Sequence, residues 1–276
     1  MIPRIGSALR ALVLVALWQT ALASVGAAPA RAAAPAPAAA PRGMVASAER
    51  HATEAGLAML VAGGNAVDAA VATAFALSVT EPYHSGIGGG GFLLVHLASG
   101  ETIALDARET APAAAHPGLY LEPGVAEDAS RSGALSVATP GLVAGLALAL
   151  ERWGTLPLAE VMAPAIALAE DGFPIGLRHA RMIEICRGMG HAERFPETAA
   201  IQAPPAGTPA TPGWRLVQKE LAATLRAIAR DGPDAFYRGP VAEAITREVQ
   251  RGGGILTTED LASYRPKLRE PVRGRY

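Results

Sequence analysis

The 276-residue sequence has one cysteine and almost no net charge. A single thiol, Cys186, excludes an intramolecular disulfide, so we expect the apolar core to hold the fold. Because Cys186 lies among Ile183, Ile185 and Met189, we expect it to be a buried structural residue rather than a nucleophile. The 24 basic and 25 acidic residues nearly cancel. This balance gives no electrostatic reason to expect nucleic acid or an anionic membrane surface as a partner.

The sequence also lacks several motifs that would define a common active site. Its six histidines show no paired spacing such as H-x-x-x-H, so we predict no metal site. The glycine block at residues 86–91 lacks the Lys-Ser/Thr ending of a phosphate loop and enters a strand, so we assign its glycines to positive φ angles and close packing. His84 and Ser85 lack the Gly-x-Ser-x-Gly setting of a serine hydrolase.

The first residues carry the pattern of an export signal. A basic region with Arg4 and Arg10 precedes an apolar run at residues 11–18, and residues 21–23 offer a small-x-small cleavage site. That run is shorter than the roughly 20 residues of a membrane span. We predict a signal peptide over 1–23, an Ala/Pro-rich linker over 24–43 and a folded region over 44–276. The protein would be periplasmic or secreted, with no membrane attachment after signal cleavage, for which sites near residues 28 and 34 are alternatives.

Apolar periodicity with glycine and proline boundaries predicts a mainly helical region with one β-hairpin. The hairpin strands are residues 92–97 and 102–106, and Arg108 directly follows the second. In the helix that Asn65 caps, the buried face is predicted to consist of Val67, Ala70, Val71, Ala74 and Phe75. The other predictions are helices over 51–62, 139–154, 158–171, 219–230, 240–251 and from Thr257, strands at 44–46 and from 271, and a surface loop over 190–213.

Asp106, Arg108 and Glu109 form a charged cluster at the end of the second hairpin strand. A guanidinium can bind a carboxylate through two parallel hydrogen bonds, a geometry that lysine cannot copy. The cluster could be a surface salt bridge that contributes little to stability. It could also be a carboxylate receptor, with acidic neighbours that hold the guanidinium or accept a substrate ammonium. The residues alone leave both interpretations open.

From about residue 45 to 276, the sequence resembles the large-subunit region of gamma-glutamyltranspeptidases. Six segments carry the resemblance in the same order: residues 63–70 (GGNAVDAA), 85–92, 106–112, 140–141, 232–239 and 253–257. One such segment could match by chance, whereas six in order form a specific signal.

The resemblance implies an α+β fold, part of the four-layer α/β/β/α sandwich of N-terminal nucleophile hydrolases, incomplete here and with a helix-rich second half. In that family a precursor cuts itself before a threonine, which then opens a small subunit. The threonine hydroxyl attacks the γ-amide carbonyl of glutathione or another γ-glutamyl compound, and its own α-amino group is the base. Water, an amino acid or a peptide accepts the γ-glutamyl group. No metal or organic cofactor is implied.

One binding residue of the family transfers to this sequence: Arg108 matches the arginine that binds the α-carboxylate of the γ-glutamyl group. No catalytic residue transfers, because the threonine, the oxyanion glycines and the ammonium-binding acids are expected after Tyr276. Thr257 and Thr258 are expected to start a helix instead. The chain alone would be inactive and would need the small subunit of the same precursor. Two alternatives remain, a cephalosporin (glutaryl) acylase of this family and a non-catalytic exported remnant of the scaffold.

Overall fold

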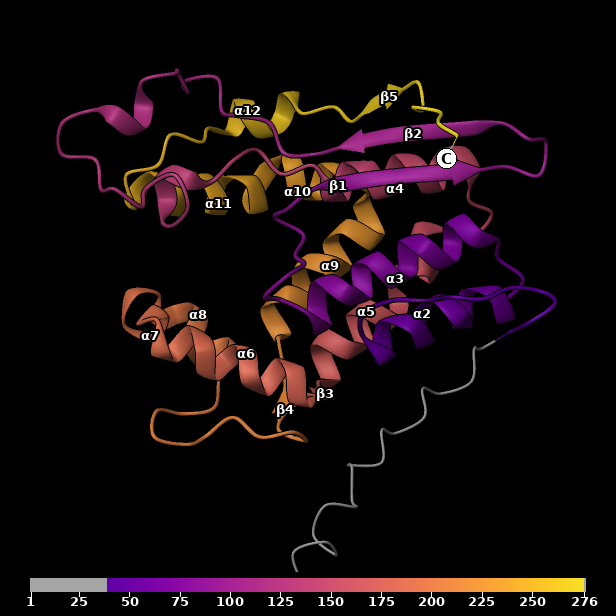
Figure 1. The fold of residues 1–276 in the computed structure, drawn as a ribbon, viewed down its shortest axis with the longest axis horizontal. Coiled ribbons are helices and arrows are strands. Elements are labelled where there is room, and N and C mark those ends of the chain that lie inside the picture. Colours follow the sequence, from indigo (N-terminus) through magenta and orange to yellow (C-terminus); the bar gives the residue numbers. More distant parts are fainter. Residues whose placement is uncertain (1–38, 276) are drawn as a thin grey trace, which may run out of the picture. The chain divides into compact units, whose positions relative to one another are not determined.

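The computed structural model describes residues 39–275, so the predicted signal peptide and most of the linker lie outside the described residues. The elements below belong to the compact unit that begins at Arg42. Its main sheet contains β1 (Gly91–His96), β2 (Thr102–Ala107) and β5 (Lys267–Arg269) in the order β1-β2-β5, with antiparallel pairing throughout. The predicted hairpin is therefore confirmed, and helices lie along one side of it (Figure 1).

The two faces of this sheet differ in burial. Phe92 pairs with Asp106 and Leu94 pairs with Ala104, which places these side chains on one face. Phe92 and Leu94 are 69% and 72% exposed, whereas Leu105 on the other face is completely buried. Among residues 39–275, helices cover the Leu105 face. The opposite face, which we call the outer face, leaves the side chains of Phe92 and Leu94 exposed.

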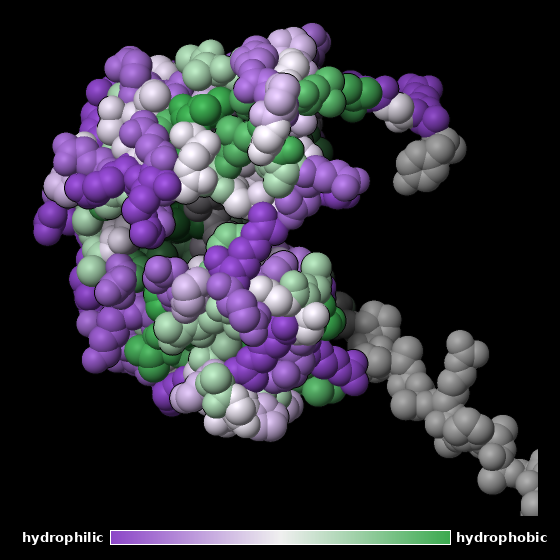
Figure 2. All heavy atoms as spheres, turned by 90° about the vertical axis from the view of Figure 1, so that its left-hand side faces the viewer, coloured by the Kyte–Doolittle hydropathy of each residue, from purple (hydrophilic) through white to green (hydrophobic). Residues whose placement is uncertain are grey.

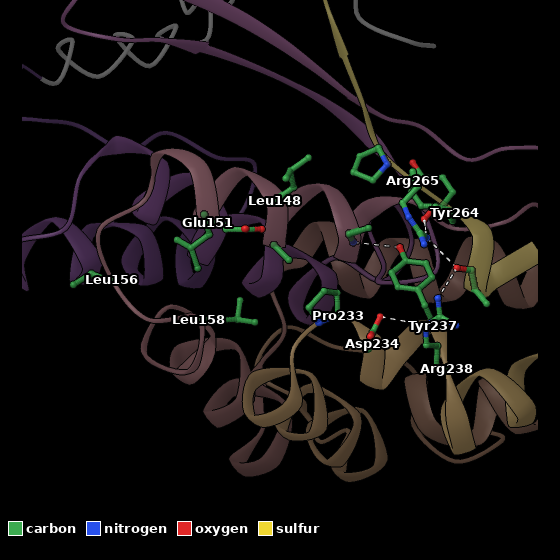
Figure 3. Close-up of a pocket in the computed structure, with 15 residues that line it drawn as sticks. Leu148, Glu151, Leu156, Leu158, Pro233, Asp234, Tyr237, Arg238, Tyr264 and Arg265 are labelled. Atoms are coloured by element: carbon green, nitrogen blue, oxygen red, sulfur yellow. Dashed lines mark hydrogen bonds and ion pairs between the residues drawn. The ribbon is translucent and has the colours of Figure 1, made fainter.

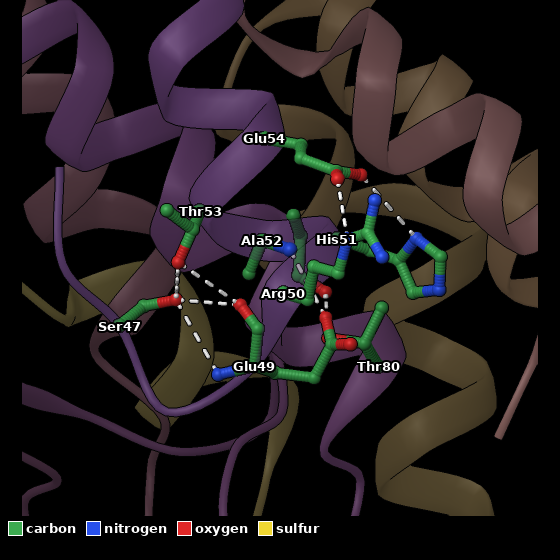
Figure 4. A network of polar contacts seen from close by, with 9 residues as sticks. Ser47, Glu49, Arg50, His51, Ala52, Thr53, Glu54 and Thr80 are labelled. Atoms are coloured by element: carbon green, nitrogen blue, oxygen red, sulfur yellow. Dashed lines mark hydrogen bonds and ion pairs between the residues drawn. The ribbon is translucent and has the colours of Figure 1, made fainter. Parts of the chain in front are cut away.

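The helix α2 (Arg50–Val61) begins at a polar network. The Glu49 carboxylate accepts a hydrogen bond from the Ala52 N–H at 3.0 Å, and the Ser47 and Thr53 hydroxyls lie 2.7 Å apart (Figure 4). The Glu49 contact satisfies one of the backbone N–H groups that a helix start leaves unpaired. At the other end, Gly63 has a φ of 92°, a left-handed conformation that glycine adopts readily and that ends the helix.

The helix α3 (Ala66–Thr80) is buried on more sides than its periodicity predicts. Val67, Val71 and Phe75 are buried as expected, but Ala70 is exposed and Ala74 is half-buried. Because α2, α4 and α5 all pack against α3, its interior positions extend around the helix. The additional buried apolar residues are Ala69, Ala72, Ala76 and Val79.

The second half is helical, as predicted. The helices are α4 (Leu142–Trp153), α5 (Leu158–Asp171), α6 (Leu177–Gly188), α7 (His191–Arg194), α8 (Pro196–Gln202), α9 (Lys219–Asp231), α10 (Asp234–Tyr237), α11 (Gly239–Arg251) and α12 (Thr258–Ser263). The smaller elements are the 3-10 turns η1 (Leu119–Leu121) and η2 (Ala134–Ser136), and the strand pair β3 (Phe173–Pro174) and β4 (Arg215–Leu216).

Several local predictions are wrong. The supposed loop over 190–213 contains α7 and α8, the second with Pro196 in its first turn, a position that proline tolerates. Residues 44–46 form no strand, and β5 ends at Arg269, before the strand expected from residue 271. Cys186 is half-buried rather than buried. It lies on α6, a helix that was not predicted, whose buried residues are His179, Ala180 and Ile183.

The molecular face at the left of Figure 1 mixes apolar and polar side chains and is hollowed near its centre (Figure 2). Helices of residues 39–275 are all too short or too polar to serve as a transmembrane span.

Asp68 is completely buried and joins the start of α3 to the connection between α4 and α5. Its carboxylate accepts hydrogen bonds from the backbone N–H groups of Asn65 (2.7 Å), Thr155 (2.8 Å) and Leu156 (3.0 Å), and from the Thr155 hydroxyl (2.7 Å). Burial opposes ionisation, but these donors outweigh it and lower the pKa of Asp68. The ionised carboxylate therefore stabilises this junction.

We predict that Asp68→Asn lowers the free energy of unfolding by about 1–3 kcal/mol, because the amide NH2 would face N–H donors and leave one unsatisfied. The folded-state pKa lies below the ordinary value of 3.8, so the contribution of Asp68 is present above that value and is lost as the pH falls through the folded-state pKa. Denaturant unfolding between pH 7 and pH 2 measures both effects. Asp231→Asn is the control, since this exposed partner of Arg230 should change stability little. Equal losses for the two variants would contradict the role of Asp68.

Candidate functional site

Arg108 lies directly after β2, the central strand of the sheet, as the sequence analysis predicts. Its side chain is 56% exposed, and its Nη1 atom lies 3.1 Å from Oε2 of Glu109, whose side chain is 25% exposed. No other partner of the guanidinium is found within residues 39–275. Most of its donors therefore remain available to a ligand.

The backbone of Arg108 is held on both sides. Its N–H donates to Oδ1 of Asp106 at 2.9 Å, and its carbonyl accepts a hydrogen bond from the Tyr264 hydroxyl at 2.8 Å. The other Asp106 oxygen accepts a hydrogen bond from Nε of Arg269 at 2.6 Å. The Arg108 N–H, and after it Arg269, lower the pKa of Asp106. Asp106 therefore orients the Arg108 backbone rather than its guanidinium.

The segment that follows Arg108 is tied to two helix starts. Thr110 and Thr139 exchange backbone hydrogen bonds of 3.1 and 2.8 Å just before α4. The Ala113 N–H donates to Oδ1 of Asp260 at 2.7 Å. Asp260 also forms a capping box with Thr257 at the start of α12, which confirms that Thr257 begins a helix.

The glycine block packs backbone against backbone beside Arg108. A Cβ atom on Gly90 would lie 2.5 Å from the Ala107 carbonyl oxygen and 2.9 Å from Oε2 of Glu109. The Gly89 carbonyl accepts hydrogen bonds from the N–H groups of Gly141 and Leu142, both at 2.9 Å. Close packing is thus confirmed, whereas the predicted positive φ angles are wrong, since none occurs within residues 86–91.

Tyr264 reaches Arg108 through a narrow gap. A Cβ atom on Gly141 would lie 2.1 Å from the Tyr264 hydroxyl oxygen and 2.3 Å from the Ala107 carbonyl oxygen. The Tyr264 ring stacks on Tyr237 with centroids 5.8 Å apart and an interplanar angle of 8°. Burial, followed by the charges of Asp106 and Glu109, raises the pKa of Tyr264 to about 12. Its hydroxyl therefore remains a protonated donor near neutral pH.

A cavity of about 660 Å³ lies beside the two tyrosines. Tyr237, Tyr264 and Arg238 line one side, and leucines of α4 and α5 line the other (Figure 3). The Arg238 guanidinium is already engaged by Asp234 and by the Ala262 carbonyl. The cavity is therefore mainly an apolar recess behind the Arg108 segment.

The other candidate residues form no second site. His84 lies 3.2 Å from Arg178 through Nε2, and no hydrogen bond joins it to Ser85 within the described part of the chain. No group of three or more metal-ligating side chains occurs among residues 39–275. Arg108 and its acidic neighbours are thus the one predicted site whose members the fold brings together.

Comparison with known proteins defines the class of this fold. The crystal structure of Helicobacter pylori gamma-glutamyltranspeptidase superimposes with a TM-score of 0.83 at 40% identity, covering 87% of this chain and 69% of that one. This likeness confirms the expected α+β fold of an N-terminal nucleophile hydrolase. The gamma-glutamyltranspeptidase family profile matches residues 52–276. The chain belongs to the gamma-glutamyltranspeptidase family.

Two curated relatives have different activities in their names. The glutathione hydrolase proenzyme of Escherichia coli (strain K12) is 43% identical over 239 residues, which cover 85% of this chain and 40% of the relative. The acylase ACY 1 proenzyme of Pseudomonas sp. (strain SE83) is 45% identical over 243 residues, covering 85% of this chain and 43% of the relative. The chain thus spans less than half the length of the curated relatives it matches.

Three residues that support the Arg108 segment were not predicted from the sequence, namely Tyr264, Arg269 and Asp260. Tyr264 lies 156 positions after Arg108, and Arg269 lies 163 positions after Asp106. No local periodicity links positions so far apart. The capping pattern of Thr257 and Asp260 is visible in the sequence, but the second contact of Asp260, with Ala113, is not.

We predict that Gly141→Ala destabilises the protein by about 1–3 kcal/mol, because its methyl group would overlap the Tyr264 hydroxyl and the Ala107 carbonyl. Gly88→Ala is the matched control in the neighbouring glycine block, since a Cβ atom there meets nothing within 4 Å. Thermal unfolding of both variants measures the difference. An unfolding midpoint for Gly141→Ala equal to that of Gly88→Ala would mean that this contact is looser than the structure shows.

Proposed function

We propose that the complete protein is a γ-glutamyltransferase and hydrolase acting on glutathione and other γ-glutamyl compounds. The observation that carries this proposal is the half-exposed Arg108 guanidinium at the end of the central strand, in a chain of the gamma-glutamyltranspeptidase family. Its free donors suit a bidentate contact with the α-carboxylate of the γ-glutamyl group. The glutathione hydrolase name of the Escherichia coli relative agrees with this donor class.

In the proposed reaction, Arg108 holds the donor and does not take part in bond making. A threonine at the start of a small subunit attacks the γ-amide carbonyl, with its α-amino group as general base. The leaving amine departs, and water, an amino acid or a peptide then accepts the γ-glutamyl group. The small subunit arises by self-cleavage of the same precursor, which agrees with the word proenzyme in the names of the relatives.

We propose that the small subunit binds to the outer face of the sheet. Phe92 and Leu94 expose apolar side chains on this face. Large apolar side chains exposed side by side on one face of a strand are typical of surfaces that another layer covers. A second sheet packed there would complete the sandwich and would bring its residues close to Arg108, which leaves the same sheet.

The proposed domain organisation keeps a signal peptide over 1–23, a linker over 24–43 and the large-subunit region over 44–276. The basic n-region and short apolar run support export to the periplasm or the exterior. The near balance of charges supports a small-molecule substrate rather than nucleic acid.

A second candidate function is glutaryl acylase activity on a cephalosporin side chain. The 45% identity to an acylase ACY 1 proenzyme favours it. A glutaryl group retains the carboxylate that Arg108 would bind but lacks the ammonium. Hydrolysis rates of a γ-glutamyl anilide and a glutaryl anilide by the complete protein separate the two functions. A preference for the glutaryl anilide would overturn the γ-glutamyl proposal.

For the complete protein, we predict that Arg108→Lys raises KM for a γ-glutamyl anilide by about 10- to 100-fold, the effect of replacing a bidentate contact with a single one. The unfolding midpoint should stay unchanged, because the guanidinium is half-exposed and pairs with Glu109 alone in the described structure. Steady-state kinetics and thermal unfolding test this. Arg178→Lys, an exposed arginine near His84, is the control. Unaltered kinetics for Arg108→Lys would remove Arg108 from the site.

We further predict that Leu94→Glu reduces association of the two proposed subunits, since it buries a charge in the interface. Val61→Glu, at the exposed end of α2, is the control with 82% initial exposure. Size-exclusion chromatography of the processed proteins shows whether the subunits remain together. Normal association of the Leu94→Glu protein would place the small subunit elsewhere.

A further inference from the structure

We propose that Tyr264 is a positioning residue for Arg108, and that its hydroxyl sets where the guanidinium meets the donor carboxylate. This inference rests on the proposed function, because it concerns how the same site is built. Tyr264 itself does not contact the donor. It acts through the Arg108 carbonyl, to which it donates a hydrogen bond of 2.8 Å.

The surroundings of Tyr264 restrict the position of its hydroxyl. The residue is 7% exposed, and its ring stacks on Tyr237. On the hydroxyl side it reaches the gap that Gly141 leaves open, where even a methyl group would collide with it. A buried hydroxyl held in this way is a rigid donor, and the high pKa of Tyr264 keeps its proton in place near neutral pH.

The Arg108 backbone needs this second attachment because the first is local. Asp106, which accepts the hydrogen bond from the Arg108 N–H, lies only two positions before it, near the end of β2. Tyr264 instead connects the Arg108 carbonyl to the segment between α12 and β5, far away in sequence. Without this bond the peptide group between Arg108 and Glu109 could rotate, and both side chains would change direction. Displacement of about 1 Å in a substrate-holding group can lower activity strongly.

Tyr237 provides a matched control, because it shares the stack but not the contact. It is 5% exposed, and its hydroxyl donates to the Pro140 carbonyl at 3.0 Å and accepts from the Ala144 N–H at 3.2 Å. Tyr237→Phe therefore removes a buried tyrosine hydroxyl from the same pair of rings. It leaves the hydrogen bond between Tyr264 and Arg108 in place.

The test compares Tyr264→Phe, Tyr237→Phe and Arg108→Ala in the complete protein. Each is assayed with a γ-glutamyl anilide and with the analogue whose α-carboxylate is replaced by a carboxamide. The ratio of kcat/KM for the two donors reports recognition of the carboxylate. We expect Tyr264→Phe to lower this ratio about three- to tenfold, the effect of one lost hydrogen bond, mainly through KM. Tyr237→Phe should leave the ratio within about twofold of the original protein.

Assays are run well below the lower unfolding midpoint of the two phenylalanine variants, so that a loss of folding cannot imitate the effect. Arg108→Ala should abolish the preference for the carboxylate, and adding Tyr264→Phe to it should change nothing more, because both act on one contact. If Arg108→Ala retains the preference, the proposed function of Arg108 fails. If Arg108→Ala loses the preference while Tyr264→Phe keeps it, or if Tyr237→Phe lowers the ratio equally, the positioning role of Tyr264 is overturned.

Discussion

The contact on which this structure depends is the backbone-to-backbone approach between the end of β2 and the start of α4. The Gly89 carbonyl, just before β1, accepts hydrogen bonds from the N–H groups of Gly141 and Leu142 at the start of α4. Gly141 also allows the close approach of the Ala107 carbonyl at the end of β2. A methyl group on Gly141 would push these two segments apart. The helices and the sheet are therefore in direct backbone contact next to Arg108, with no bulky side chain between them.

Buried or partly buried carboxylates hold the connections that surround this contact. Asp68 joins α3 to the loop after α4, and Asp260 joins the segment after Arg108 to α12. Each accepts several N–H or O–H donors, so its charge is compensated by hydrogen bonds rather than by a buried cation. These hydrogen bonds fix the position of each connecting segment relative to the helix, which apolar packing alone would not do. The Arg108 side chain can remain exposed to a ligand because Asp106 and Tyr264 hold its backbone.

Much of the fold follows from local patterns. The hairpin, the capped starts of α3 and α12, and the long helices of the second half agree with predictions from periodicity and capping residues. The failures have physical reasons as well. The short helices α7 and α8 lie among prolines, which hide their periodicity, and residues 44–46 have strand composition but no neighbouring strand to pair with. α3 is buried beyond its predicted face because three helices surround it.

The sequence by itself determined the family, the position of Arg108 after a strand, and the glycines that permit close packing. Each of these features depends on residues that are close in the chain, so it can be recognised as a sequence motif. The tertiary structure decided what holds Arg108. Tyr264 and Arg269 come from a segment more than 150 positions away, and β5 becomes a strand by pairing with β2. Contacts between residues so far apart produce no periodic pattern in the sequence, because they form only when packing brings the segments together.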